Sequence, residues 1–328
     1  MRGYAGFAIR KVAGAAVTIF AIVCVNFVIF RLVPGDPVRM LFGDPRAGAE
    51  LIQEMRERFG LTGSLWQQFL AYLNRLFLHG DLGISFVQRK PVMETVVDRL
   101  PQTLLLVVTA LAIAVVVGTF LGAIAGWRTG TRFDAIIVSI SLGIYSIPTF
   151  IWGIILLIVF AVALGLFPLG GMATLGAGYS GWAYLRDVAW HLVLPGGAIV
   201  MWYMGEYVLL TRSAMQDVVD QDYITAARAK GIKESTVLRR HALRNAILPV
   251  VTITGVNLAF AVSGVIEAET VFNWPGIGRL MYDSVMRRDY PVLQGLFLVF
   301  AVSVVLANLV VDLIYGYIDP RIKVGGPK

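Results

Sequence analysis

The chain has 328 residues, of which 57% are hydrophobic and only 15% are charged, and its mean hydropathy is +0.74. Soluble domains average about 45–50% apolar and about 25% charged residues, so this composition excludes an ordinary water-soluble fold and favours a chain embedded in a lipid bilayer. The net charge of +7 is compatible with nucleic acid or an anionic membrane surface as a partner, but the charges lie between apolar spans, so we expect membrane lipid and no nucleic acid.

The first apolar span is Val12–Phe30, which contains no charged residue. Nineteen helical residues at about 1.5 Å each cross a hydrocarbon core of about 30 Å. The apolar region of a secretory signal peptide is shorter, about 7–15 residues, and a small-residue cleavage site follows it. We therefore interpret residues 1–30 as a cytoplasmic N-terminus followed by an uncleaved first transmembrane helix.

Residues 31–100 are the only sizeable polar part, with nine Lys or Arg and eight Asp or Glu. Two segments, Glu50–Phe59 and Ser64–Leu78, have helical spacing, and each is closed by a nearby glycine, Gly60 and Gly80. Fewer than seventy residues rarely hold a core alone. The sequence predicts a small helical external lobe after the first helix.

Residues 101–317 form the expected transmembrane core, and residues 318–328 a cytoplasmic tail. Within the third apolar span, Pro148 predicts a kink or a break. With the first span, the chain has six transmembrane helices, and the other five are expected at Pro101–Trp127, from about Asp134 to about Leu164, His191–Thr211, Ala246–Ile266 and Pro291–Val311.

The basic residues of the short segments indicate the orientation. Fifteen Lys or Arg lie in the N-terminus, the 128–132 link, the loop between the fourth and fifth spans and the C-terminus, whereas four lie in the short loops of the other side. Cytoplasmic loops carry the excess of Lys and Arg. Both termini and the long central loop, residues 213–245, are therefore predicted to be cytoplasmic.

The chain lacks the motifs of an enzyme. No G-x-x-x-x-G-K-[ST] phosphate loop is present, and neither is an H-E-x-x-H or C-x-x-C metal motif. The three histidines, His79, His191 and His241, fall in three different segments. We expect no catalytic residue, no metal and no bound cofactor, and a membrane hydrolase is excluded because it would need a nucleophile with its base.

The central loop contains the signals for two short helices. Asp220 or Asp222 can cap the first helix, Gly231 can end it with a positive φ, and Ser235 can cap a second helix over Thr236–Asn245. Tyr223, Ala226 and Ala227 share one face of the first helix, where small alanines let another surface approach closely. On these residues alone, an ordinary basic loop and a docking element remain equal alternatives.

This loop resembles the signature loop of binding-protein-dependent ABC importer permeases of the dipeptide/oligopeptide/nickel family. Thr225-Ala226-Ala227, three further residues and then Gly231 follow that family's pattern, with threonine in place of its glutamate. Further segments along the chain resemble the same family, namely 30–37, 80–85, 269–278, 288–291, 308–312 and 319–321. The chain is thus identified as a member across nearly its whole length.

The resemblance implies a type I ABC importer permease fold in a bacterial or archaeal plasma membrane. It implies four kinds of partner: a second homologous permease, two ATPase subunits that bind ATP and Mg, an external substrate-binding protein, and membrane lipid. Peptides are the expected cargo, and the chain itself is not an enzyme. The residues implied to couple the chain to an ATPase are Asp222, Tyr223, Thr225, Ala226, Ala227, Arg228, Lys230 and Gly231.

Other polar residues are weaker candidates. Glu206 and Asn257 lie within spans and are candidates for the pathway or a gate; alternatively, Glu206 pairs with Arg212 or a partner chain, and Asn257 bonds a neighbouring helix. Glu267 and Glu269 lie at the outer edge and are candidate contacts for the binding protein. A self-sufficient secondary transporter or channel remains the alternative function, although such proteins often have paired halves with broken helices, which this sequence lacks.

Overall fold

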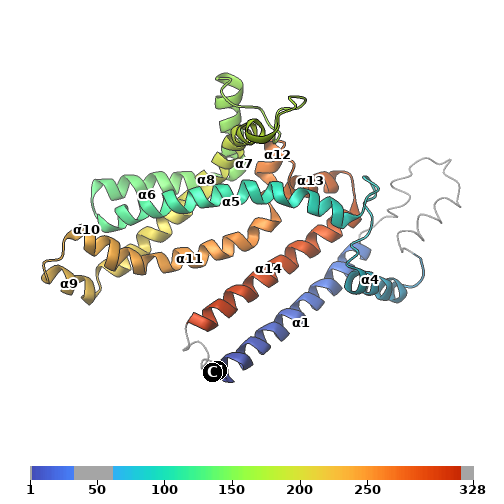
Figure 1. Ribbon diagram of the computed structural model, residues 1–328, viewed down its shortest axis with the longest axis horizontal. Helices are drawn as coiled ribbons and strands as arrows, with labels where there is room; N and C mark the ends of the chain where they lie inside the picture. Colours follow the sequence, from blue (N-terminus) through green and yellow to red (C-terminus); the bar gives the residue numbers. More distant parts are fainter. Residues whose placement is uncertain (1, 33–61, 319–328) are drawn as a thin grey trace. The chain divides into compact units, whose positions relative to one another are not determined.

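The structure, a computed structural model, describes residues 2–32 and 62–318 (Figure 1). Almost all of these residues are helical, and the one β-bridge among them joins Ile84 and Pro91. The all-α membrane fold expected from the sequence is therefore confirmed. The helix expected at Glu50–Phe59 and the tail from residue 319 lie outside the described residues.

Fifteen helical segments are bounded as follows: α1 Arg2–Leu32, α4 Leu65–His79, α5 Val92–Trp127, α6 Arg132–Tyr145, α7 Thr149–Leu156, η1 Leu157–Ala163, α8 Gly181–Val219, α9 Asp222–Ala229, α10 Glu234–Thr236, η2 Val237–Ala242, α11 Leu243–Phe260, η3 Ala261–Ser263, α12 Ile266–Val271, α13 Ile277–Met286 and α14 Tyr290–Ile318. Segments η1 and η2 are π-helical and η3 is a 3₁₀ turn. Segments α10 to η3 follow one another without a gap, over residues 234–263.

Five of the described helices are long and apolar enough to cross a membrane, and a sixth span results if α6 with α7–η1 is counted as one. That pair is bent by 94° at a short break. Pro148 is the N-cap residue of α7 at this break. The break predicted at Pro148 is therefore confirmed. Its cause is that proline lacks the backbone N–H that would continue the helical hydrogen bonds.

The helices extend beyond the predicted spans. Helix α5 begins at Val92, before the predicted start of the second span at Pro101, and carries Pro101 inside it. Helix α8 starts at Gly181 and ends at Val219, well outside His191–Thr211. The apolar run marks only the part of a helix that faces lipid, whereas backbone hydrogen bonding continues into the polar flanks until a breaking residue ends it.

The described chain divides into two compact units, which we treat separately. The first contains residues 1–101 and 280–328, where α1 and α14 lie side by side (Figure 1). Lys11 of α1 forms an ion pair with Asp312 of α14 at 2.7 Å. Asn26 of α1 donates to the Gln294 carbonyl at 3.0 Å. Polar contacts thus join the first and last spans at two separate positions along their length.

Helix α4 belongs to residues 62–100, the described part of the segment that the sequence predicts to be an external lobe. Ser64 caps it with a complete capping box: the Gln67 backbone N–H donates to the Ser64 hydroxyl, and the Ser64 backbone N–H donates to the Gln67 side-chain oxygen. Gly80 ends it in the left-handed region at φ 62°, as its sequence predicted. Tyr72 packs on Phe27 of α1 with ring centroids 5.6 Å apart, so the helix is held against the first span.

The second unit contains residues 102–279. Its centre is the close approach of α5 to α8 through Gly118, Gly122 and Gly126. A Cβ on Gly122 would lie 2.5 Å from the Val208 carbonyl oxygen, so only glycine permits this contact. Helices α6 and α11 also pack on α8. A small-residue stripe of this kind lets helix backbones approach where lipid supplies no hydrophobic force.

Candidate functional site

The central loop forms the helix expected from its sequence. Helix α9 runs from Asp222 to Ala229, and Lys230 follows as its C-cap. The N-cap is Gln221 without a side-chain bond, so the prediction that Asp220 or Asp222 caps this helix is wrong. Asp220 ends α8, and Asp222 occupies the first turn of α9, where an acidic side chain is favoured by the helix dipole.

Gly231 makes the predicted turn after α9. Its φ is +71°, and its N–H donates to the Arg228 carbonyl at 2.9 Å. A Cβ at this position would meet nothing within 4 Å, so the backbone conformation and not the available space favours glycine.

The second helix of the loop begins earlier than predicted. Helix α10 starts at Glu234 with Lys233 as its N-cap, so Ser235 lies inside the helix and does not cap it. The helix also does not end at Asn245, because helical residues continue through η2 and α11 to Phe260. The backbone is therefore helical without interruption from residue 234 into the fifth span.

One face of α9 is buried against the chain itself. Ile224 is fully buried and Ala227 is 5% exposed. Both belong to a hydrophobic cluster, here called the loop core, whose other buried members are Ala123, Met215, Val237, Ala242 and Ala246. The close approach predicted at Ala227 is therefore made to α5, α8 and the η2–α11 helix, which corrects its assignment to a partner-facing surface.

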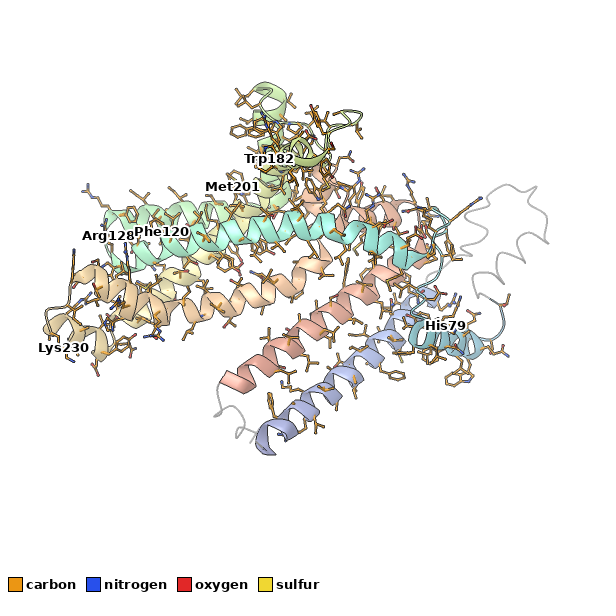
Figure 2. All side chains as sticks on the ribbon, in the orientation of Figure 1. His79, Phe120, Arg128, Trp182, Met201 and Lys230 are labelled. Carbon is orange, nitrogen blue, oxygen red and sulfur yellow. The ribbon has the colours of Figure 1, made fainter. Side chains whose placement is uncertain are left out.

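The other face of α9 is exposed. Its exposed residues include seven of the eight predicted coupling residues: Asp222, Tyr223, Thr225, Ala226, Arg228, Lys230 and Gly231. Figure 2 shows Lys230 and Arg128 at one end of the second unit and Trp182 at its opposite end. The coupling residues predicted from the sequence therefore form, with the exception of Ala227, a polar and partly basic surface at one end of this unit.

Polar contacts tie α9 to its neighbours. The Arg228 guanidinium lies 4.9 Å from the centre of the Trp127 ring of α5 and bonds Glu234 of α10 at 3.0 Å. The Tyr223 hydroxyl accepts a hydrogen bond from Asn245 of α11 at 2.7 Å. Together with the loop core, these contacts connect α9 to α5, to α8 and to the continuous helical stretch over residues 234–263.

The two candidate pathway residues contact each other. Asn257 of α11 donates to the Glu206 carboxyl of α8 at 3.4 Å and to the Tyr207 hydroxyl at 3.1 Å. Glu206 and Asn257 are half-buried and Tyr207 is fully buried. The polar groups of these two spans therefore meet inside the unit, and the neighbouring-helix alternative for Asn257 is realised.

Arg212, the alternative partner of Glu206, binds another residue. Its guanidinium forms a two-point ion pair with Asp134 of α6, including a bond of 2.8 Å from Nη2 to Oδ2. Asp134 is 3% exposed and also accepts the Gly130 N–H at 3.0 Å. From the sequence, Asp134 marks only the approximate start of the third span, and no local pattern pairs it with Arg212, which lies 78 residues later.

Glu267 and Glu269 differ sharply in their surroundings. Glu269 of α12 is fully buried, and its carboxylate accepts the Thr103 hydroxyl of α5 at 2.8 Å and the Arg279 N–H at 3.0 Å. Burial raises the pKa of Glu269. The Glu269 side chain thus bonds both α5 and the backbone at Arg279, and because it is buried it cannot contact a binding protein. Glu267 is exposed and stays a predicted contact for the binding protein.

A cavity of about 570 Å³ lies beside Glu267 in the second unit. The break between α6 and α7, one stretch of α8 and the segment before α12 form its walls. The lining residues are Tyr145, Ser146, Pro148, Thr149, Ile199, Trp202, Tyr203, Gly264, Val265, Ile266 and Glu267. The cavity was not foreseen from the sequence, because three distant segments build it.

Known proteins of one family match this chain over nearly its whole length. Residues 118–324 match the family described as binding-protein-dependent transport system inner membrane component, and residues 5–107 match the N-terminal domain of such components. The dipeptide transport system permease protein DppB of Escherichia coli is 37% identical over 97% of this chain and 98% of its own. The oligopeptide transport system permease protein AppB of Bacillus subtilis is 37% identical over 97% and 99%. The glutathione transport system permease protein GsiC of Escherichia coli is 39% identical over 97% and 98%.

Proposed function

Because the chain belongs to the family of binding-protein-dependent transport system inner membrane components, we propose that it forms half of the translocation pathway of an ATP-driven peptide importer. A second, homologous permease forms the other half. Two ATPase subunits bind ATP and Mg, and an external binding protein delivers the cargo. The sequence of this chain contains no phosphate-loop motif for ATP, and in this proposal the chain is a non-catalytic subunit.

The single observation that carries the coupling proposal is the geometry of α9. Its outer face is exposed, while Ile224 and Ala227 fix its inner face to the loop core. Movement of an ATPase bound to the outer face would displace α9 together with the helix that starts at Glu234. A partner shifts a conformational equilibrium only by binding one state more tightly, so this contact must differ between the outward-open and inward-open states.

The proposed orientation places α9 and both termini in the cytoplasm of a bacterial or archaeal cell. The basic residues of the 128–132 link and the central loop support it through the positive-inside rule. Arg128 and Lys230 lie at the same end of the second unit (Figure 2), as that orientation requires. Trp182 lies at the other end, where it would meet the outer interface.

Peptides are the proposed cargo because the three relatives described above are named for dipeptides, oligopeptides and glutathione, all of which contain peptide bonds. Glu206 and Asn257 are the proposed pathway or gate residues, since their contact joins two spans. A Glu206→Gln variant with wild-type uptake would remove Glu206 from this assignment.

The test is reconstitution of the chain into proteoliposomes with and without the ATPase subunits. We expect ATP-dependent uptake of a dipeptide or tripeptide only when the second permease, the ATPases and the binding protein are all present. Uptake by the chain alone, driven by an ion gradient, would instead establish the alternative function of a secondary transporter or channel.

A further inference from the structure

The cavity beside Glu267 has a composition that selects one kind of ligand. Three aromatic residues line it: Tyr145 stacks on Trp202 with centroids 5.6 Å apart, and Trp202 meets Tyr203 edge-on at 5.0 Å. Glu267 is exposed and is the only charged residue among the lining residues. Aromatic faces and a carboxylate both attract cations, and no basic side chain of the lining opposes them.

We propose that this cavity binds the N-terminal ammonium group of the transported peptide, with Glu267 as its ion-pair partner and the rings of Trp202 and Tyr203 around it. This inference rests on the proposed function, because it assigns a binding subsite within a peptide permease. Its volume of about 570 Å³ falls in the range of about 300–1,000 Å³ typical of small-molecule sites.

An organic ammonium fits the lining better than a metal ion. The lining contains one carboxylate and neither histidine nor cysteine, whereas a transition-metal ion needs several such ligands. The lining also contains two hydroxyl groups, those of Ser146 and Thr149. The Ser146 hydroxyl donates to the Leu142 carbonyl at 2.7 Å, so its oxygen can accept a bond from a peptide N–H. The aromatic walls would be redundant for a hydrated metal ion but favour an alkylammonium.

One lining residue of the cavity lies near a pathway candidate. Tyr203 lines the cavity, and Glu206 follows three positions later on α8, so both lie on the same side of that helix about one turn apart. Glu206 in turn contacts Asn257.

The experiment measures binding of two peptides with a neutral, amidated C-terminus to the purified, nucleotide-free transporter complex in nanodiscs, without the binding protein. Trialanine amide carries only the N-terminal ammonium as a charge, and N-acetyl-trialanine amide carries none. We expect the amine form to bind at least about tenfold more tightly, the order of one ion-pair or cation–π contact. Calorimetry gives the affinity of each peptide.

Three variants complete the design. Glu267→Gln should bring the two affinities within about twofold, while Glu267→Asp should keep part of the preference. Glu94→Gln is the matched control, because Glu94 is exposed and outside the cavity lining; it should retain the full preference. Thermal melting of each complex checks that all variants are folded.

Equal binding of both peptides to the wild type, binding of neither, or an unchanged preference in Glu267→Gln would each overturn the proposal. ATP-dependent uptake is measured separately, after the same purified complexes are reconstituted into proteoliposomes with the binding protein. Normal peptide uptake together with any of those results would refute the ammonium site and leave the proposed function standing, whereas absence of peptide uptake would refute both.

Discussion

Truncation of one buried side chain should separate ATP hydrolysis from transport. Ile224 is fully buried in the loop core and is the largest apolar side chain that α9 places there. Replacing Ile by Ala in a core costs about 2–5 kcal/mol. Taking about 3 kcal/mol, the ratio of undocked to docked α9 rises more than 100-fold, since each 1.4 kcal/mol is a factor of ten.

In Ile224→Ala the ATPases would still bind the exposed face of α9, but α9 would separate from the loop core and move without displacing α10 and α11. We expect ATP hydrolysis to continue while peptide uptake falls at least about tenfold, so the number of peptides moved per ATP drops. The assay measures both rates on the same proteoliposomes. Ile224→Val, which costs about 0.5–1.5 kcal/mol, should give an intermediate ratio.

Leu194→Ala is the matched control. Leu194 is 4% exposed in a different hydrophobic cluster, with Leu156, Ala161, Ala198 and Phe272, so its truncation costs stability in the same range without touching α9. It should lower the melting temperature and leave the ratio of peptide to ATP intact. Equal ratios in Ile224→Ala and the wild type, or an equal loss in Leu194→Ala, would refute a transmitting role for the loop core.

Three further predictions follow from single contacts. Gly231→Pro should abolish uptake without preventing membrane insertion, because proline cannot adopt φ +71° and loses the N–H that bonds the Arg228 carbonyl; Gly231→Ala should be milder, and wild-type uptake with normal ATPase stimulation in the proline variant would contradict the role of this turn. Gly122→Ala should destabilise the protein by about 1–3 kcal/mol, because the new Cβ collides with α8, whereas Gly143→Ala, with nothing within 4 Å, should be neutral or stabilising in the same melting assay. Because burial raises the pKa of Glu269, the folded state binds the Glu269 proton more tightly than the unfolded state does. The contribution of this proton to stability should therefore decline as the pH rises above 4.5, the ordinary pKa of a glutamate. Glu269→Gln should flatten the dependence of the melting temperature on pH, and an unchanged slope would argue against Glu269 as the titrating group.

Several features were predictable because their causes are local. The break at Pro148 and the positive φ of Gly231 depend on the covalent geometry of one residue. The capped helix after Ser64 depends on residues three positions apart. The exact ends of α5 and α8 were missed, because hydropathy reports contact with lipid and helix formation continues beyond it.

Other features depend on which helices become neighbours. Asp134 and Arg212 are 78 residues apart in the chain, and Glu206 and Asn257 are 51 apart, so no local pattern links either pair. Glu267 and Glu269 are nearly adjacent in sequence, but one is exposed and the other fully buried against Thr103. A helix turns by about 100° per residue, and only the packing of its neighbours decides which side is the interior.

Composition, hydropathy and short motifs are sufficient to predict a helical membrane chain with apolar spans, a polar central loop and the motifs of a permease family. The packing of distant segments is needed to show that Ala227 faces the chain's own loop core, that Arg212 binds Asp134, and that Tyr145, Trp202 and Glu267 line one cavity. Hydropathy and backbone preference act within a few residues. Burial and pairing arise only when distant segments meet.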